Sequence, residues 1–164
     1  MSVDRFTLDT NILIYSIDAT AGTSNETAVL IVERAVGLAS CLTLQSVSEF
    51  FAAVTRKGRL SRVRAADMAR TWLNMFPIVC ASADAAAVAL EHVVAGRTSY
   101  WDGLLIATAA EAGCSAILTD DMADGTVLSG VRVINPFTSI GISDAADRVV
   151  EQYHPDWNRE AILG

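Results

Sequence analysis

The sequence is poor in the features that mark secreted, membrane-spanning and disulfide-stabilised proteins. Its three cysteines, Cys41, Cys80 and Cys114, are odd in number and widely spaced, so the sequence predicts neither a disulfide framework nor a zinc site. No basic segment followed by an apolar stretch opens the chain, and no apolar run approaches the roughly 18 residues of a membrane-spanning helix. We therefore expect a protein of the reducing cytoplasm.

Motifs for covalent catalysis and cofactor binding are also lacking. The chain has no Gly-x-Gly-x-x-Gly and no Gly-x-x-x-x-Gly-Lys segment, the usual signs of dinucleotide and nucleoside-triphosphate binding. Its two histidines, His92 and His154, have no serine or cysteine beside them in a nucleophile setting. Cofactor chemistry and a catalytic triad are therefore not expected.

Positive charge is scarce and unevenly placed. The chain has 12 Lys and Arg residues against 19 Asp and Glu, a formal net charge of −7, which argues against coating nucleic acid by bulk electrostatics. Half of the positive residues lie between positions 56 and 70, namely Arg56, Lys57, Arg59, Arg62, Arg64 and Arg70. This basic cluster is either a local RNA contact or a solvated helical surface, and the sequence leaves both open.

Short apolar segments alternate with Ala-rich segments of helical periodicity, as in an α/β protein. Strands are predicted at 6–8, 41–44, 76–79, 116–119 and 131–134, and helices at 25–39, 47–56, 62–74, 83–95 and 102–112. This order predicts a mostly parallel sheet covered by helices on both faces, with the functional site at the carboxyl ends of the strands. Residues 1–137 form the predicted domain, and 138–164 form an appendage with a helical pattern at 144–152.

Acidic residues follow two of the predicted strands. Asp9 follows the first, and Asp120 with Asp121 follows the strand at 116–119. Because parallel strands bring their carboxyl ends to one edge, we expect these carboxylates to lie close together. Each also has a purely structural interpretation: Asp9 as a helix N-cap, and the pair as part of a polar turn.

Two further acids are predicted near helix starts at the same edge. Glu49 follows Ser46, and Asp102 follows Ser99, with the Ser-x-x-acid spacing of a capping box. Capping alone could explain either residue. Carboxylates that converge raise one another's pKa unless a cation compensates, and oxygen ligands favour Mg²⁺ or Mn²⁺ over zinc. The sequence therefore predicts that Glu49 and Asp102 join Asp9 and the Asp120–Asp121 pair in one divalent-cation site.

The order of these segments resembles the PIN-domain nucleases, most closely the VapC-like toxins of type II toxin–antitoxin pairs. The resemblance runs from Phe6 to Phe137. It is carried by the segments Phe6-Thr7-Leu8-Asp9-Thr10-Asn11, Gln45-Ser46-Val47-Ser48-Glu49-Phe50, Tyr100-Trp101-Asp102, Ile117-Leu118-Thr119-Asp120-Asp121-Met122 and Val131-Arg132-Val133-Ile134-Asn135-Pro136-Phe137.

The resemblance implies a set of site residues. It assigns the family's four acidic positions to Asp9, Glu49, Asp102 and Asp121. Asn11 and Thr119 become supporting residues, and Asp120 is an additional metal ligand. Independently of the resemblance, an acidic site needs outlying positive charge to bind RNA, so Arg56, Lys57, Arg59 and Arg97 are candidate RNA contacts, and Arg97 is expected near Asp102.

The same resemblance implies a fold, a reaction and partners. The fold is a five-stranded parallel sheet flanked by helices, in a homodimer. The reaction is endonucleolytic hydrolysis of single-stranded RNA, with tRNA or another structured RNA as the expected substrate, assisted by Mg²⁺ or Mn²⁺ and leaving a 5′-phosphate. The partner is a cognate VapB-like antitoxin that offers a basic group to the carboxylates.

Three alternatives remain at this point. A Mg²⁺-dependent phosphatase or phosphotransferase would use Asp9 as its nucleophile, but Asn11 stands where a second acid is wanted and Lys57 is the only lysine. A receiver-like or degenerate domain would bind a partner and use its acids as caps. A housekeeping RNA-processing PIN nuclease would share the same site, and the gene beside this one would distinguish it from a toxin.

Overall fold

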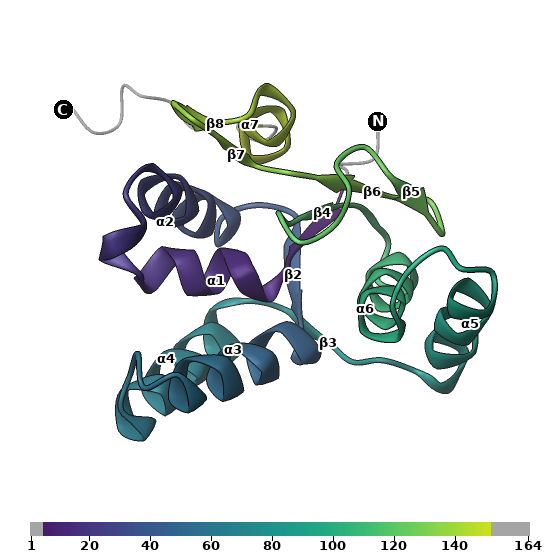
Figure 1. Ribbon diagram of the computed structural model, residues 1–164, viewed down its shortest axis with the longest axis horizontal. Helices are drawn as coiled ribbons and strands as arrows, with labels where there is room; N and C mark the ends of the chain where they lie inside the picture. Colours follow the sequence, from purple (N-terminus) through teal and green to yellow (C-terminus); the bar gives the residue numbers. More distant parts are fainter. Residues whose placement is uncertain (1–4, 152–164) are drawn as a thin grey trace, which may run out of the picture.

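The computed structural model describes residues 5–151, and a central β-sheet forms its middle layer (Figure 1). The strand order is β3-β2-β1-β4-β6-β5, with bounds β1 Arg5–Leu8, β2 Ser40–Thr43, β3 Ile78–Val79, β4 Cys114–Leu118, β5 Val127–Leu128 and β6 Val131–Ile134. The first five strands in this order run parallel, which confirms the predicted α/β fold. The sheet has six strands instead of five, because the two-residue β5 pairs antiparallel with β6 at one edge.

Helices cover both faces of the sheet (Figure 1). Their bounds are α1 Thr10–Ile17, α2 Thr23–Ala35, α3 Leu44–Arg56, α4 Arg62–Met75, α5 Ala83–Val94, α6 Tyr100–Glu111 and α7 Asp144–Glu151, with a 3₁₀ turn, η1, at Ala19–Ala21. Side chains alternate between faces along a strand: Leu118 packs in the core with α1 to α4, whereas Ile117 packs against α6. The strands are apolar on both faces, as the parallel arrangement requires.

The start of α3 differs from the sequence prediction by three residues. We expected a strand through Leu44 and a helix from Val47, but β2 ends at Thr43 and α3 begins at Leu44. The Thr43 hydroxyl accepts a hydrogen bond from the Ser46 amide at 3.0 Å, so Thr43 is the N-cap. The apolar Leu44 side chain, which suggested a longer strand, is exposed on the first helical turn.

The segment after β6 packs against the main body. It forms a hairpin of β7 (Phe137–Thr138) and β8 (Gly141–Ile142), followed by α7, which confirms the helical pattern predicted from residue 144. Ala146 and Val150 of α7 are buried in the same apolar core as α2, and Arg34 pairs with Asp147 at 3.0 Å. Residues 152–164, which include His154, lie outside the described residues.

The structure also shows where the three cysteines lie and how long and apolar the helices are. Cys41, Cys80 and Cys114 are free, and the buried Cys41 and Cys114 sulfur atoms lie 3.5 Å apart on strands flanking β1. Cys80, in contrast, is exposed. Within residues 5–151, no helix is long and apolar enough to cross a membrane.

Candidate functional site

Asp9 lies at the centre of the candidate site, where β1 ends and α1 begins. Leu8 is in register with Leu118 on the neighbouring β4, so Asp9 and Thr119 leave the sheet side by side. One Asp9 oxygen, Oδ1, accepts from the Thr10 amide at 2.7 Å, which makes Asp9 the N-cap of α1. The other, Oδ2, accepts from the Thr119 hydroxyl at 2.8 Å. The capping interpretation is therefore correct, and it is compatible with a further role.

Burial makes the Asp9 carboxylate costly to ionise. Only 7% of the residue is exposed, and this desolvation raises its pKa to about 6 from an ordinary value of 3.8. The hydrogen bonds from Thr119 and Thr10 oppose the rise, whereas the charges of Asp121 and Glu49 add to it. Asp9 is thus a buried acid whose charge is sensitive to anything positive that comes near.

Asn11 and Thr119 connect Asp9 to Asp120. The Asn11 side-chain amide donates to the Thr119 hydroxyl at 3.1 Å and also to an Asp120 oxygen. The second Asp120 oxygen accepts from the Tyr15 hydroxyl at 3.0 Å, and burial together with this carboxylate raises the Tyr15 pKa. Asp120 is therefore held by two donors from α1, one of which also contacts Thr119.

Asp121 is placed differently from its neighbour. Its backbone amide donates to the Thr119 hydroxyl at 3.1 Å, and its residue is exposed. Desolvation and then the charge of Asp120 raise the Asp121 pKa, with smaller contributions from Asp102 and Glu49. A hydrogen bond from the Asn11 side chain of α1 opposes the rise, so the Asp121 carboxylate is coupled both to the other predicted acids and to α1.

Glu49 reaches the site from the second turn of α3. The Thr10 hydroxyl donates to its Oε2 at 3.3 Å, and the Gln45 side-chain amide donates to its Oε1 at 2.9 Å. Because Ser46 lies inside α3, the predicted capping box of Ser46 and Glu49 is wrong. Thr10 contacts both Asp9 and Glu49, so one residue links two of the predicted acids.

Asp102 stands on the first turn of α6. The Ser99 hydroxyl accepts from the Asp102 amide at 3.2 Å and donates to its carboxylate at 2.7 Å, so this residue does take part in capping. Asp102 also lines a cavity of about 210 Å³ together with Asp121 and Arg97. The structure therefore brings Asp102 close to Asp121, and Arg97 close to Asp102 as expected.

The oxygen donors at the site suit a hard divalent cation, although their side chains are not arranged at metal-ligand distances in residues 5–151. In residues 5–151, no three His, Cys, Asp or Glu side chains converge at ligand distances. Each outlying acid is hydrogen-bonded to a neighbour instead: Glu49 to Gln45, Asp102 to Ser99 and Asp120 to Tyr15. The available ligands are all oxygens, and the Asn11 carbonyl Oδ1 is buried without a partner. Such a donor set fits Mg²⁺ or Mn²⁺.

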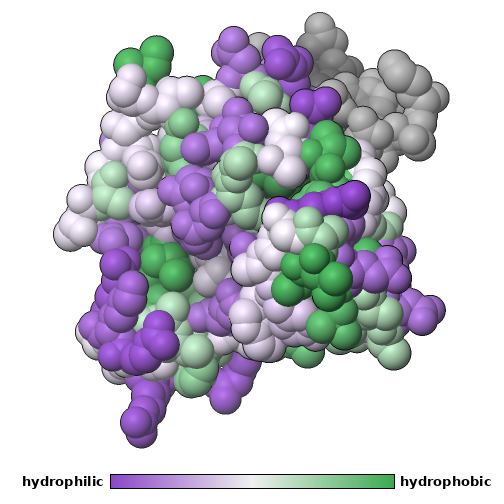
Figure 2. Space-filling model, turned by 45° about the vertical axis from the view of Figure 1, so that its right-hand side comes forward, coloured by the Kyte–Doolittle hydropathy of each residue, from purple (hydrophilic) through white to green (hydrophobic). Residues whose placement is uncertain are grey.

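Three of the candidate basic residues lie at the end of α3 or just beyond it. Arg56, at the end of α3, lines a cavity of about 390 Å³ with Thr10 and Glu49, whereas Arg59 pairs with Asp18 at 2.9 Å. Lys57 is exposed at the C-cap of α3. Hydrophilic side chains project from the lower part of the molecule in Figure 2, the level at which α3 and α4 lie in Figure 1.

Sequence reasoning missed Thr10 and Tyr15. The signal was present, because a helix that starts directly after Asp9 places Asn11 and Tyr15 four residues apart on one face. We expected that helix to begin near Ile12. Its true first turn was missed because α1 is rich in β-branched residues, which have a lower helix propensity.

Comparison with known proteins places this architecture among characterised folds. The family model described as "PIN domain" matches residues 6–123. Among solved structures, the sarcin-ricin-loop-cleaving toxin VapC20 of Mycobacterium tuberculosis is 18% identical, with a TM-score of 0.55 over 68% of this chain and 86% of its own. FitAcB from Neisseria gonorrhoeae (20%, TM-score 0.57) and a toxin–antitoxin complex from Klebsiella pneumoniae (22%, TM-score 0.56) each cover 80% of this chain and 97% of theirs. No curated protein gives a significant sequence match.

Proposed function

This chain belongs to the PIN-domain family, and from that premise we propose that it is a Mg²⁺- or Mn²⁺-dependent endoribonuclease. The observation that carries the proposal is the buried Asp9 carboxylate, whose raised pKa reflects both burial and the nearby charges of Asp121 and Glu49. The negative charge of this carboxylate lowers the stability of the fold, since a buried charge beside like charges opposes folding. A buried carboxylate among other acids is explained if it binds a cation that takes part in the reaction.

Asp9, Glu49, Asp102 and Asp121 are the proposed catalytic and metal-binding acids, with Asp120 as a further ligand. When bound, Mg²⁺ or Mn²⁺ supplies charge neutralisation at the scissile phosphate and lowers the pKa of water. The protein's own contribution is orientation. Thr119 and Thr10 fix the two Asp9 oxygens, and the exposed Glu49 and Asp121 side chains can turn towards Asp9.

Asn11 and Tyr15 have positioning roles in this proposal. They hold Asp120 through both of its carboxylate oxygens, which keeps the loop after β4 against α1. That loop carries Asp121, so its position relative to Asp9 depends on these contacts. The Asn11 Oδ1 atom, buried and unpartnered, can accept a hydrogen bond from water or substrate at the same place.

RNA binding must rely on local positive charge and on the cation, since the chain carries a net charge of −7. Arg56, Lys57 and Arg97 are the proposed phosphate contacts, because they flank the acids and have no carboxylate within 4 Å among residues 5–151. Arg59 becomes a weaker candidate, because Asp18 already pairs with it.

We further propose that the activity is that of a toxin held inactive by a VapB-like antitoxin. Several structures with this fold are toxin–antitoxin complexes. An acidic site suits a basic inhibitory side chain, because charge-assisted hydrogen bonds to carboxylates are strong. Homodimerisation, which the resemblance implies, has a candidate surface on α5, where Leu90, Val93 and Val94 are exposed (Figure 2, right of centre).

The test of the nuclease is cleavage of a mixed pool of tRNA and other structured RNA. Wild-type protein is expected to cut RNA with Mg²⁺ or Mn²⁺, and not with EDTA, whereas Asp9→Asn and Asp102→Asn lose most activity. Asp67→Asn is the matched control, since Asp67 is exposed on α4 and its one ion pair among residues 5–151 is with Arg70. If folded wild-type protein neither binds Mn²⁺ nor cuts RNA, the nuclease proposal is wrong and the acids serve as helix caps and turn residues.

A further inference from the structure

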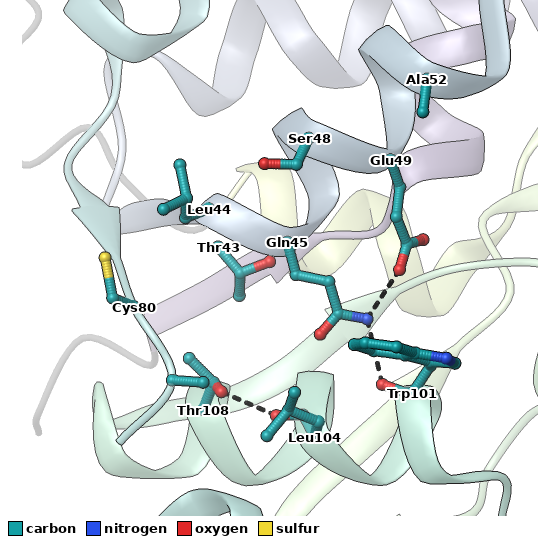
Figure 3. A pocket seen from close by; sticks show the side chains of 11 residues that line it. Thr43, Leu44, Gln45, Ser48, Glu49, Ala52, Cys80, Trp101, Leu104 and Thr108 are labelled. Atoms are coloured by element: carbon teal, nitrogen blue, oxygen red, sulfur yellow. Dashed lines mark hydrogen bonds between the residues drawn. The ribbon is translucent and has the colours of Figure 1, made fainter. Parts of the chain in front are cut away.

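A cavity of about 690 Å³ opens between α3 and α6, beside the acidic site. Its walls are largely apolar, and Leu44, Ala52 and Leu104 line it (Figure 3). Glu49, one of the proposed catalytic acids, also lines it, so the cavity and the acidic site share a wall. At its other end lies Cys80, from the segment after β3. A concave apolar volume of this size with a few polar groups is the usual form of a ligand pocket.

Gln45 supplies an unused hydrogen-bond acceptor in this wall. Its amide nitrogen donates to the Glu49 carboxylate at 2.9 Å and to the Trp101 carbonyl oxygen at 3.1 Å. Both partners are acceptors, so the amide can only be oriented with nitrogen towards them. Its Oε1 atom is then directed away from them and is buried with no donor (Figure 3). A ligand that brings an N–H group there removes an energetic penalty.

Trp101 stands at the junction of two cavities. Its side chain lines the apolar cavity next to Glu49, and it also lines the smaller cavity that contains Arg56 and Thr10. Although it is a large aromatic residue, 61% of it is exposed. Neither core packing nor a cap explains that exposure. Single-stranded nucleic acids stack their bases on flat aromatic side chains of this kind, and Arg56, a proposed phosphate contact, lines the same small cavity.

We propose that the cavity between α3 and α6 is a subsite for one unpaired nucleobase of the RNA substrate, next to the scissile phosphate. The inference rests on the proposed nuclease function and extends it to substrate recognition. The base stacks on the Trp101 indole and donates an N–H to Gln45 Oε1. The adjoining backbone passes Glu49 and meets Arg56, the positive group of the smaller cavity, at a neighbouring phosphate.

The arrangement of charge favours a nucleotide over a protein segment. Apolar walls, an aromatic surface and an acceptor suit a base, while Arg56 two turns beyond Glu49 on α3 suits a phosphate. A peptide helix would also cover apolar walls, but it would leave Gln45 Oε1 unpaired unless it carried a polar side chain at that point. The substrate must therefore be unpaired at this nucleotide, which places cleavage in loops or single strands.

The test combines a change in the protein with a change in the RNA. With Mn²⁺, Trp101→Ala is expected to lower kcat/KM on the order of tenfold, mainly through KM, and Trp101→Phe to restore most of it. An abasic nucleotide beside the cleaved bond should lower the wild-type value similarly. If ring and base touch, combining the two changes costs no more than either alone. Effects that multiply would overturn the subsite.

Ile140→Ala is the matched control, because Ile140 is 92% exposed in the turn between β7 and β8, at the other end of the molecule in Figure 1. A binding assay separates the subsite from catalysis. In the Asp9→Asn background with EDTA, fluorescence anisotropy of a short single-stranded RNA should show roughly tenfold weaker binding for Trp101→Ala. This assay judges the subsite even if the wild-type protein cuts nothing. Unchanged affinity with an altered sedimentation mass would assign the cavity to protein association instead.

Discussion

At the scale of single residues, Asp9 illustrates a conflict between folding and chemistry. Its carboxylate caps α1, which stabilises the fold, but its charge is buried and lies close to other acids. The folded-state pKa of about 6 lies above the ordinary value of 3.8. Folding therefore stabilises the protonated form of Asp9 relative to the ionised form. The stability that this protonated form contributes is fully present below about pH 4 and is lost as the pH rises through 6. At neutral pH the folded protein bears a cost of about 3 kcal/mol.

Asp9→Asn should therefore stabilise the protein at neutral pH. Asparagine keeps the N-cap acceptor but carries no charge, so we expect the free energy of unfolding at pH 7.5 to rise by about 1–3 kcal/mol. The gain should shrink towards pH 4, where folded wild-type Asp9 is protonated and the same carboxyl in the unfolded chain is close to its ordinary pKa of 3.8. Urea unfolding at the two pH values measures it. Asp67→Asn serves as control, and an equal gain at both pH values would mean that burial of the Asp9 charge is not the cause.

At the scale of elements, helix caps hold the acids in place. Ser99 caps α6 and also donates to the Asp102 carboxylate, whereas Ser82 caps α5 in the same manner through the Ala85 amide at 2.9 Å. Ser82 also donates to the Glu111 carboxylate at 2.7 Å, so each serine caps a helix and contacts one acid, but only Ser99 touches a proposed catalytic acid.

Comparing Ser99→Ala with Ser82→Ala separates the two roles. Each substitution is expected to cost about 1 kcal/mol of stability, because each helix loses its N-cap. RNA cleavage should fall several-fold only for Ser99→Ala, since the Asp102 carboxylate loses the hydrogen bond that orients it. Thermal unfolding and initial cleavage rates give the two readouts. Equal losses of activity would mean that Ser99 acts through stability alone.

The elements also show how far the sequence could lead. The main helices were predictable from their apolar period, and the five parallel strands from short continuous apolar runs, although β3 itself is only two residues long. The antiparallel β5 and the β7–β8 hairpin were not, since a two-residue strand has no period to detect. At the site, strand order was enough to bring Asp9 close to Thr119, but side-chain partners such as Tyr15 with Asp120 depend on where a helix begins.

At the scale of the whole molecule, the β7–β8 hairpin and α7 pack against the main apolar core, to which Ala146 and Val150 of α7 contribute. Val150 is 3% exposed on α7, and Arg34 of α2 pairs with Asp147. Whether the functional unit ends at residue 137 stays a prediction, but α7 packs against the same layer that carries α1 and hence the site.

Val150→Asp tests this dependence. A charge placed in the apolar core without a partner should cost about 3 kcal/mol or more, whereas Arg148→Asp on the exposed side of α7 should stay within about 0.5 kcal/mol. Chemical denaturation followed by far-ultraviolet circular dichroism measures both. If the two variants are equally stable, α7 contributes nothing to the stability of the domain.

The edges of the sheet have a consequence for how the protein behaves at high concentration. Both edge strands, β3 and β5, are only two residues long, and β5 turns back antiparallel against β6. An edge this short offers few free backbone groups for strand addition by another chain. Strand addition at these edges is therefore disfavoured, and the buried apolar central strands stay out of reach of a neighbouring chain.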